Sequence, residues 1–296
     1  MTPKRHGKRP AKPKRQGRQK VPVGAAAKTR GKQSSRAEES AVKPPNRPQK
    51  ALAGSPSALW LYGRHAVAAA LTNPDRKVLR VLTTRNGSEW LAANVVGKAL
   101  STPVLDVRPE DIDLLLHPGA VHQGIAAEVK AIPPRELDEI CANPSAGTSV
   151  VVLDQVTDPQ NIGAIFRVAA AFGARAIIVQ DRRTPPLTGA LAKAAAGAIE
   201  SVPCVPVVNI SRALETLADL GYETIGLAGE ASVTMQSINT TSPMALVLGA
   251  EGAGLRRLVS EKCTQLVRIP IAPGMESLNV ATAAAIGLYE RSRDRN

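Results

Sequence analysis

Three polar segments of the chain carry side chains that could do chemistry. Each of them follows an apolar run and precedes a helical pattern. The first is Asp-Pro-Gln-Asn-Ile-Gly at 158–163, which leads to Arg167; the second is Gly-Ala-Glu-Gly-Ala-Gly at 249–254; the third ends in Ser-Leu-Asn at 277–279. Glycines let a main chain approach a ligand closely. Taken one at a time, these residues also fit simpler roles: Asn161 and Asn279 as helix N-caps, Arg167 in a surface ion pair and Glu251 as a solvated carboxylate.

Histidine usage narrows the chemistry further. The four histidines are His6, His65, His117 and His122, so residues 123–296 contain none. A Ser-His-Asp or Cys-His site within that region is therefore excluded, and so is a histidine-rich metal centre. Any hydroxyl activated there must rely on other groups.

Cysteine and glycine spacing exclude two more classes of site. The cysteines Cys141, Cys204 and Cys263 are isolated, which supports neither a zinc ribbon nor a disulfide framework and fits a reducing, cytoplasmic compartment. The glycine-rich run at 249–254 has the spacing G-x-x-G-x-G, and no GxxxxGK[ST] loop is present, so a nucleotide-dependent α/β enzyme is disfavoured.

The positive charge of the chain is concentrated at its N-terminus. The net charge is +13, yet residues 1–50 hold 16 Lys and Arg against 2 Glu, and the remainder is close to neutral. With no aromatic residue and no apolar period, residues 1–56 are predicted to be a disordered basic tail. Such a tail is either simply solvated or a nonspecific RNA tether, because cationic chains bind phosphates by releasing counterions. The longest uncharged stretch, 231–250, is rich in Ser, Thr, Asn and Gln, so no membrane span is expected.

Two regions of alternating helices and strands must position the polar segments. The first is a small α/β domain at 57–131, with helices at 64–72, 88–100 and 109–116 and strands at 78–83, 104–107 and 124–129. A proline-containing linker at 132–147 follows, with a short acidic helix from Glu136. The second domain, 148–296, has strands at 149–153, 176–180, 202–208, 224–227, 244–248 and 266–269 and helices at 161–172, 188–198, 211–220, 255–262 and 279–292. Six apolar strands alternating with helices predict an open, mainly parallel sheet, in which ligands bind at the carboxyl ends of strands.

The three segments resemble the motifs of the SpoU family of RNA ribose 2′-O-methyltransferases, within the knotted SPOUT class. The resemblance rests on 158–167, on Leu-Val-Leu-Gly-Ala-Glu-Gly-Ala-Gly-Leu at 246–255, and on Ile-Pro at 269–270 followed by Ser-Leu-Asn-Val-Ala-Thr-Ala-Ala-Ala at 277–285. It covers about residues 148–293 and implies a deep trefoil knot and a homodimer formed through this domain. The third motif departs from many members, which have serine where this chain has Ala281.

The first domain carries a second resemblance. Leu-Tyr-Gly-Arg-His-Ala-Val at 61–67 and His-Gln-Gly-Ile at 122–125 are similar to the L30e-like substrate-binding domain that precedes the methyltransferase in rRNA-modifying members. The implied substrate is a guanosine in the peptidyl-transferase region of 23S rRNA, either naked or in a ribosomal subunit precursor.

The family resemblance also assigns roles to residues. Arg167 matches the catalytic arginine, with Asn161, Glu251, Ser277 and Asn279 as its neighbours. The implied methyl donor is S-adenosylmethionine, without a metal. It would be held by main chain and side chains at five positions: Leu227, Gly229, Gly249, Ile269 and Leu278.

Two alternatives remain open at this stage. One is a tRNA guanosine 2′-O-methyltransferase with the same chemistry, against which only the first domain argues. The other is a noncatalytic rRNA-binding assembly factor, which is disfavoured because all five catalytic candidates are intact.

Overall fold

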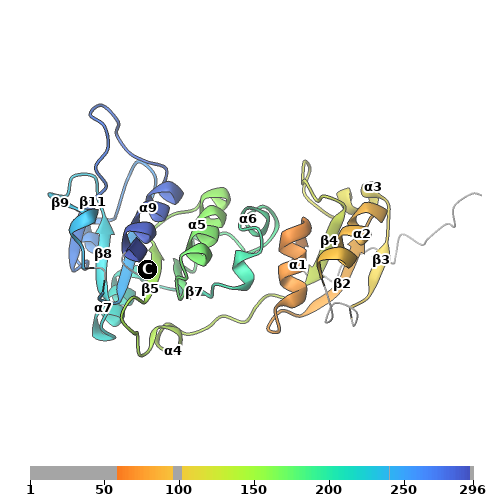
Figure 1. Ribbon diagram of the computed structural model, residues 1–296, viewed down its shortest axis with the longest axis horizontal. Coiled ribbons are helices and arrows are strands. Elements are labelled where there is room, and N and C mark those ends of the chain that lie inside the picture. Colours follow the sequence, from red (N-terminus) through yellow and green to blue (C-terminus); the bar gives the residue numbers. More distant parts are fainter. Residues whose placement is uncertain (1–58, 96–101, 240, 294–296) are drawn as a thin grey trace, which may run out of the picture. The chain divides into compact units, whose positions relative to one another are not determined.

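In the computed structural model the described residues are 59–95, 102–239 and 241–293, so the predicted basic tail lies outside them. These residues form two β-sheets. Figure 1 labels their helices and strands and colours them by position in the sequence. None of the described helices combines the length and apolar character needed to cross a membrane.

The first sheet is mixed and has four strands in the order β1-β4-β2-β3. Strand β4 pairs antiparallel with β1 and β2, whereas β3 pairs parallel to β2. Its elements are β1 (Leu59–Tyr62), α1 (Arg64–Thr72), β2 (Val78–Thr83), α2 (Arg85–Asn94), β3 (Val104–Asp106), α3 (Pro109–Asp113) and β4 (Ile125–Val129).

The second sheet has seven strands, all of them parallel, in the order β7-β6-β5-β10-β8-β11-β9. Its strands are β5 (Ser149–Leu153), β6 (Ile177–Gln180), β7 (Cys204–Val207), β8 (Glu223–Leu227), β9 (Val233–Thr234), β10 (Met244–Leu248) and β11 (Gln265–Arg268). The helices are α4 (Leu137–Cys141), α5 (Pro159–Ala171), α6 (Gly189–Ala194), α7 (Ile210–Asp219), α8 (Arg257–Ser260) and α9 (Val280–Ser292), with 3₁₀ turns η3 (Ala198–Glu200) and η4 (Met235–Ser237).

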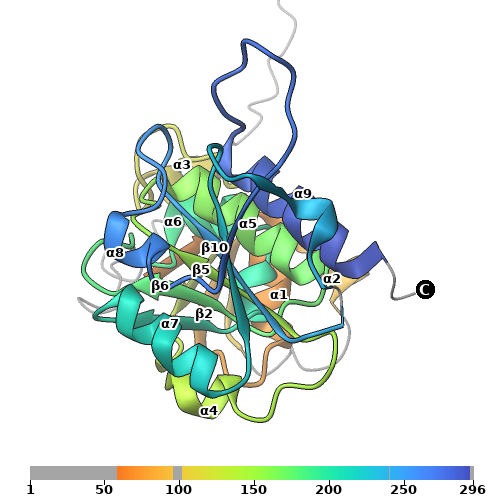
Figure 2. The same cartoon turned by 90° about the vertical axis from the view of Figure 1, so that its left-hand side faces the viewer.

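Alternating side chains of the parallel strands form two separate cores. Val151 and Leu246 belong to the cluster under α5 and α9, whereas Val150 and Val247 belong to the cluster under α7. Successive residues of a strand point to opposite faces, so a strand covered on both sides is apolar throughout. Figure 2 shows α5 and α9 on one side of the sheet and α7 and α4 on the other.

Several predicted bounds need correction. The second sheet has seven strands where six were expected, because the two-residue strand β9 carries no apolar run of its own, and β1 was also missed. Helix α2 starts at Arg85, three residues before the predicted start, because Thr84 caps it. It ends at Asn94, and residues 96–100 of the predicted helix lie outside the described residues. The helix expected at 188–198 breaks after Ala194, because Ala196 and Gly197 adopt positive φ angles of 49° and 95°.

Candidate active site

The predicted polar segments do meet at one edge of the parallel sheet. Strand β10 pairs with β5 in register, with Leu248 beside Leu153, so the loops that follow these two strands start side by side. The order of strands runs outward from β5 to β7 on one side and from β10 to β9 on the other. The boundary between β5 and β10 is therefore the switch point at which open parallel sheets bind ligands.

Three of the candidate side chains form a closed hydrogen-bonded contact at this edge. The Asn161 amide donates to Glu251 Oε1 at 2.9 Å, and the Asn279 amide donates both to Glu251 Oε1 and to Asn161 Oδ1, each at 2.9 Å. These residues are separated by up to 118 positions in sequence. One carboxylate oxygen thus ties together the openings of α5 and α9 and the glycine-rich loop.

The N-caps of α5 and α9 determine which side-chain atoms of Asn161 and Asn279 are available for this contact. Asp158 caps α5, because its Oδ2 accepts from the Asn161 main-chain N–H at 2.9 Å, so the Asn161 side chain is not the cap. Asn279 is the cap of α9, and its Oδ1 accepts from the main-chain N–H groups of Ala281 and Thr282. The simple capping role therefore fails for Asn161 and holds, together with the contact, for Asn279.

The glycine-rich loop turns back on itself after β10. Ala250 and Gly254 pair as an isolated antiparallel bridge. A Cβ at Gly249 would lie 2.2 Å from the Gly254 carbonyl carbon, so no other residue fits there without moving the loop. The loop is a tight backbone structure that presents Glu251 to Asn161.

A buried carboxylate that the sequence did not single out anchors this loop. Asp154 directly follows β5 and is fully buried. It accepts from the Arg256 main-chain N–H at 2.9 Å and from Arg256 Nε at 2.7 Å. The available signal was an acidic residue at the end of an apolar strand.

The expected cofactor residues lie at three adjacent strand ends. Leu227 ends β8, Gly249 follows β10 and Ile269 follows β11, and β8 pairs with both of the others. Leu227 and Ile269 are half-buried and pack against the core under α5 and α9, whereas Gly229 is exposed. Leu278 is half-buried in the segment that leads into α9. Apolar side chains beside exposed main chain suit a nucleoside, so these residues fit S-adenosylmethionine chemically.

Arg167 and Ser277 are not joined to the three-residue contact. Arg167 is exposed and makes no hydrogen bond or ion pair to any other described residue; it lines a cleft of about 620 Å³ together with α1 and residues 195–201. Six residues turn a helix by about 240° beyond one full turn, so Asn161 and Arg167 occupy different faces of α5. Ser277 is exposed in the loop before α9. Among the described residues, it makes no hydrogen bond to Asn161, Glu251 or Asn279. The catalytic roles of both residues stay predictions.

Side chains that could bind a metal, and the three thiols, are scattered over the described residues. Within 59–95, 102–239 and 241–293, no three His, Cys, Asp or Glu side chains are grouped to hold a metal ion. Burial raises the pKa of Cys141 to about 11 and those of Cys204 and Cys263 to about 12, so all three are neutral thiols near pH 7.

Comparison with known proteins agrees with this architecture. Residues 148–289 match the model of the SpoU rRNA methylase family, and residues 60–135 match the RNA 2′-O ribose methyltransferase substrate-binding model. The chain is 39% identical to the 23S rRNA (guanosine-2′-O-)-methyltransferase RlmB of Haemophilus influenzae, with 79% of this chain and 97% of that protein covered. It is also 39% identical to an uncharacterised tRNA/rRNA methyltransferase of Synechocystis, but spans only 62% of its length.

A solved structure extends the likeness to the fold. The AdoMet-bound rRNA methyltransferase of Sinorhizobium meliloti superposes with a TM-score of 0.68 at 27% identity, over 80% of this chain and 87% of that one. The protein is thus an α/β RNA methyltransferase, an enzyme with a mainly parallel sheet. The chain belongs to the SpoU rRNA methylase family.

Proposed function

We propose that the protein transfers a methyl group from S-adenosylmethionine to the ribose 2′-hydroxyl of a guanosine in 23S rRNA. The observation that carries the proposal is the Asn161–Glu251–Asn279 contact at the switch point, beside the three strand ends suited to the cofactor. The guanosine and the 23S substrate are argued from RlmB relatives, two of which are 39% and 37% identical to this chain, with 97% and 96% of their own lengths covered. A position in the peptidyl-transferase region, and either naked RNA or a subunit precursor as substrate, are part of the same proposal.

In this proposal the residues of the chain bind and orient the reactants. S-adenosylmethionine supplies an electrophilic methyl group on a sulfonium. Leu227, Gly229, Gly249, Ile269 and Leu278 hold it at the carboxyl edge of the sheet. Glu251 receives two amide hydrogen bonds on Oε1, so its second oxygen remains available as an acceptor. Orientation alone can supply a large part of the rate enhancement of a displacement reaction.

Arg167 is proposed to bind an RNA phosphate and thereby align the 2′-hydroxyl. A guanidinium stays protonated at neutral pH and presents several N–H donors in a fork, so it is poor as a free base and good as a phosphate ligand. Ser277 would contact the ribose or the cofactor carboxylate.

The assembly of the protein belongs to the same proposal. We infer domains at 57–131 and 148–296 with a linker at 132–147, a knotted second domain that forms a homodimer, and a cytoplasmic location. Sedimentation equilibrium of the whole chain tests the dimer, and a monomer at micromolar concentration would contradict it.

The first experiment is radiolabelled methyl transfer to purified 23S rRNA, 16S rRNA and tRNA that lack the modification. Label in 23S rRNA alone, mapped to a 2′-O-methylguanosine, is the expected result. Label in tRNA would retain the chemistry and reject the substrate. No label in any RNA or in subunit precursors, with cofactor binding demonstrated, would reject the enzymatic proposal in favour of an assembly role.

A further inference from the structure

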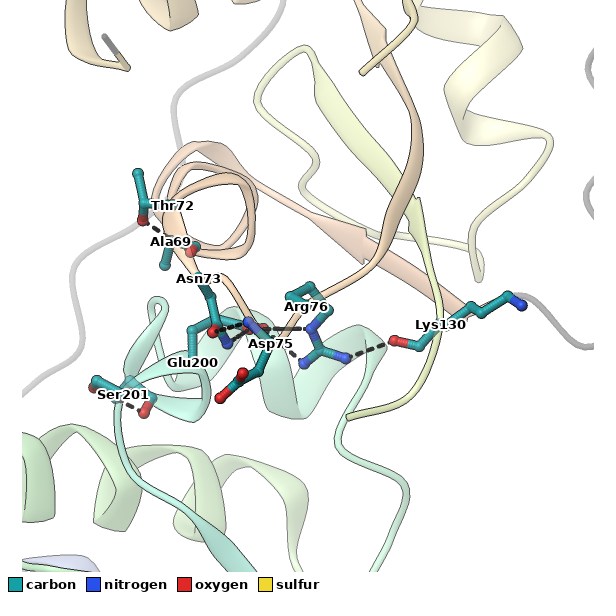
Figure 3. A network of polar contacts seen from close by, with 9 residues as sticks. Ala69, Thr72, Asn73, Asp75, Arg76, Lys130, Glu200 and Ser201 are labelled. Carbon is teal, nitrogen blue, oxygen red and sulfur yellow. Dashed lines mark hydrogen bonds and ion pairs between the residues drawn. The ribbon is translucent and has the colours of Figure 1, made fainter. Parts of the chain in front are cut away.

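A buried ion pair joins the first sheet's domain to the second. Arg76 lies between α1 and β2, and Glu200 ends the turn η3, 124 residues later. Arg76 Nη2 lies 2.7 Å from Glu200 Oε1, and Arg76 Nε donates to both carboxylate oxygens at 3.1 and 3.0 Å. The two side chains are only 2% and 6% exposed. Figure 3 shows the guanidinium directed at the carboxylate.

Two further hydrogen bonds extend this pair into a network. The Asn73 amide donates to Glu200 Oε2 at 2.8 Å. Arg76 Nη1 donates to the main-chain carbonyl of Lys130, one residue past the end of β4, at 2.9 Å. The network therefore holds three segments together: the end of α1, the residue that follows β4, and η3 (Figure 3).

The same segments form the walls of the cleft that contains Arg167. Thr72, Asn73 and Pro74 line it from the end of α1 and the turn that follows, and Glu200 and Ser201 line it from the second domain. Because Arg76 neutralises Glu200, Arg167 is left as the one uncompensated charge among the described residues that line the cleft. An anionic ligand therefore fits this cleft electrostatically.

Close backbone packing fixes the width of the cleft. A Cβ at Gly197 would lie 2.7 Å from the Ala69 Cβ, so α1 and the turn before η3 approach each other as closely as a glycine allows. Gly197 also has a φ of 95°, which other residues adopt only with strain. The wall positions are thus set both by polar contacts and by shape.

We propose that Arg76 and Glu200 are positioning residues for the RNA substrate: their ion pair holds the first domain so that RNA bound there enters the cleft at Arg167. This inference rests on the proposed function, because it takes RNA as the ligand. A buried ion pair gives little net stability, since desolvation offsets the attraction, but it is costly to break and can select one arrangement. Holding two domains in one relative orientation is a role that fits an ion pair of this kind.

The test compares Glu200→Gln with the wild type in the whole protein. Gln keeps the shape of the side chain and removes its charge. With 23S rRNA transcript as substrate, KM for RNA should rise about tenfold while kcat and cofactor affinity stay within about twofold, because only uniform substrate binding is lost. A role in folding alone would lower the active fraction, and hence kcat, without moving KM.

The control is a pair of similar burial inside one domain. Glu128 on β4 is paired with Arg80 on β2, with side chains 5% and 15% exposed. Glu128→Gln should lower the thermal midpoint without changing KM for RNA. Asn73→Ala, which removes one contact to Glu200, is the milder second variant and should raise KM by about threefold in the same direction.

A readout independent of activity is tryptic cleavage after Lys130, identified by mass spectrometry. The Lys130 carbonyl is held by Arg76, so Glu200→Gln should speed cleavage there and Glu128→Gln should not. Unchanged KM and unchanged cleavage in Glu200→Gln and Asn73→Ala would overturn the inference. If the wild type itself methylates no RNA, the proposed function fails, whereas the cleavage assay still judges the domain contact.

Discussion

The two sheets of this protein differ in strand direction, and therefore in where their strand ends lie. In the parallel sheet all seven strands end at the same edge, so loops from distant parts of the sequence meet there and build a site. In the mixed sheet β4 runs against β1 and β2, so strand ends are divided between two edges. Its outer strand β3 is exposed on all three residues, including Val104 and Leu105. The difference teaches that uniform strand direction brings side chains from distant loops together at one edge, where they can form a site. The mixed sheet instead exposes an outer strand to solvent.

The largest difference should appear in side-chain truncation. Leu246→Ala in the centre of β10 removes a fully buried side chain and should cost about 3–5 kcal/mol of unfolding free energy. Leu105→Ala on β3, where the side chain is 36% exposed, should cost less than about 0.5 kcal/mol. Urea unfolding of both variants measures the contrast. Equal losses would mean that the mixed sheet is as tightly packed as the parallel one.

The next effect concerns the carboxylate under the active-site edge. Asp154→Ala leaves the Arg256 main-chain N–H and guanidinium without their acceptor and should cost about 3 kcal/mol. Asp158→Ala, at the surface cap of α5, should cost only about 1 kcal/mol. Chemical denaturation compares the two, and cofactor binding should weaken only in Asp154→Ala. A smaller loss for Asp154→Ala than for Asp158→Ala would contradict its role as the anchor of the loop.

Removal of the exposed arginine should act on turnover and not on folding. Arg167→Ala should lower methyl transfer by about a hundredfold, equivalent to about 2.7 kcal/mol, with S-adenosylmethionine affinity unchanged. The control is Arg257→Ala, another exposed arginine, which lies on α8 and pairs with Glu261. Rate measurements under saturating RNA decide the point. Near-normal turnover of Arg167→Ala would remove Arg167 from the catalytic proposal.

The last effect is confined to the region of the linker and the parallel sheet, because all three cysteines lie between residues 141 and 263. Burial holds the pKa of Cys141 at about 11 and those of Cys204 and Cys263 at about 12, whereas an unfolded thiol ionises near about 8.5. Above that value the unfolded chain loses protons that the folded chain keeps, so stability falls as pH rises toward 11–12. The wild type should lose more thermal stability between pH 8 and 10.5 than a variant with all three cysteines changed to alanine. Parallel pH curves for the two proteins would refute this linkage.

Strands and helices could be predicted where a pattern of consecutive residues marks them, and not where they depend on distant contacts. The uninterrupted apolar runs of β5 and β10 and the Val- and Leu-rich run of β2 located these strands to the residue. Strand β9 was invisible because two residues carry no period and pair only through β11. The break in α6 depends on Ala196, an L-residue with positive φ, which no propensity indicates.

The same limit applies to the site. Parallel topology was enough to predict that the loops holding Asn161, Glu251 and Asn279 share one edge. The atoms that join them, and the separation of Arg167 from them, depend on loop lengths and helix rotation in three dimensions. Asp154 and the Arg76–Glu200 pair were missed because no motif marks these residues and their partners lie more than 100 positions away.

Helix α5 has a consequence for how this sequence can change. It carries Asn161 toward the sheet edge and, about 9 Å further along its axis, Arg167 toward the cleft. Inserting or deleting one residue between them would rotate Arg167 by about 100° relative to Asn161. Substitutions in this stretch can be absorbed one at a time, but changes of length cannot. Over evolution α5 should therefore keep a fixed spacing between these two residues.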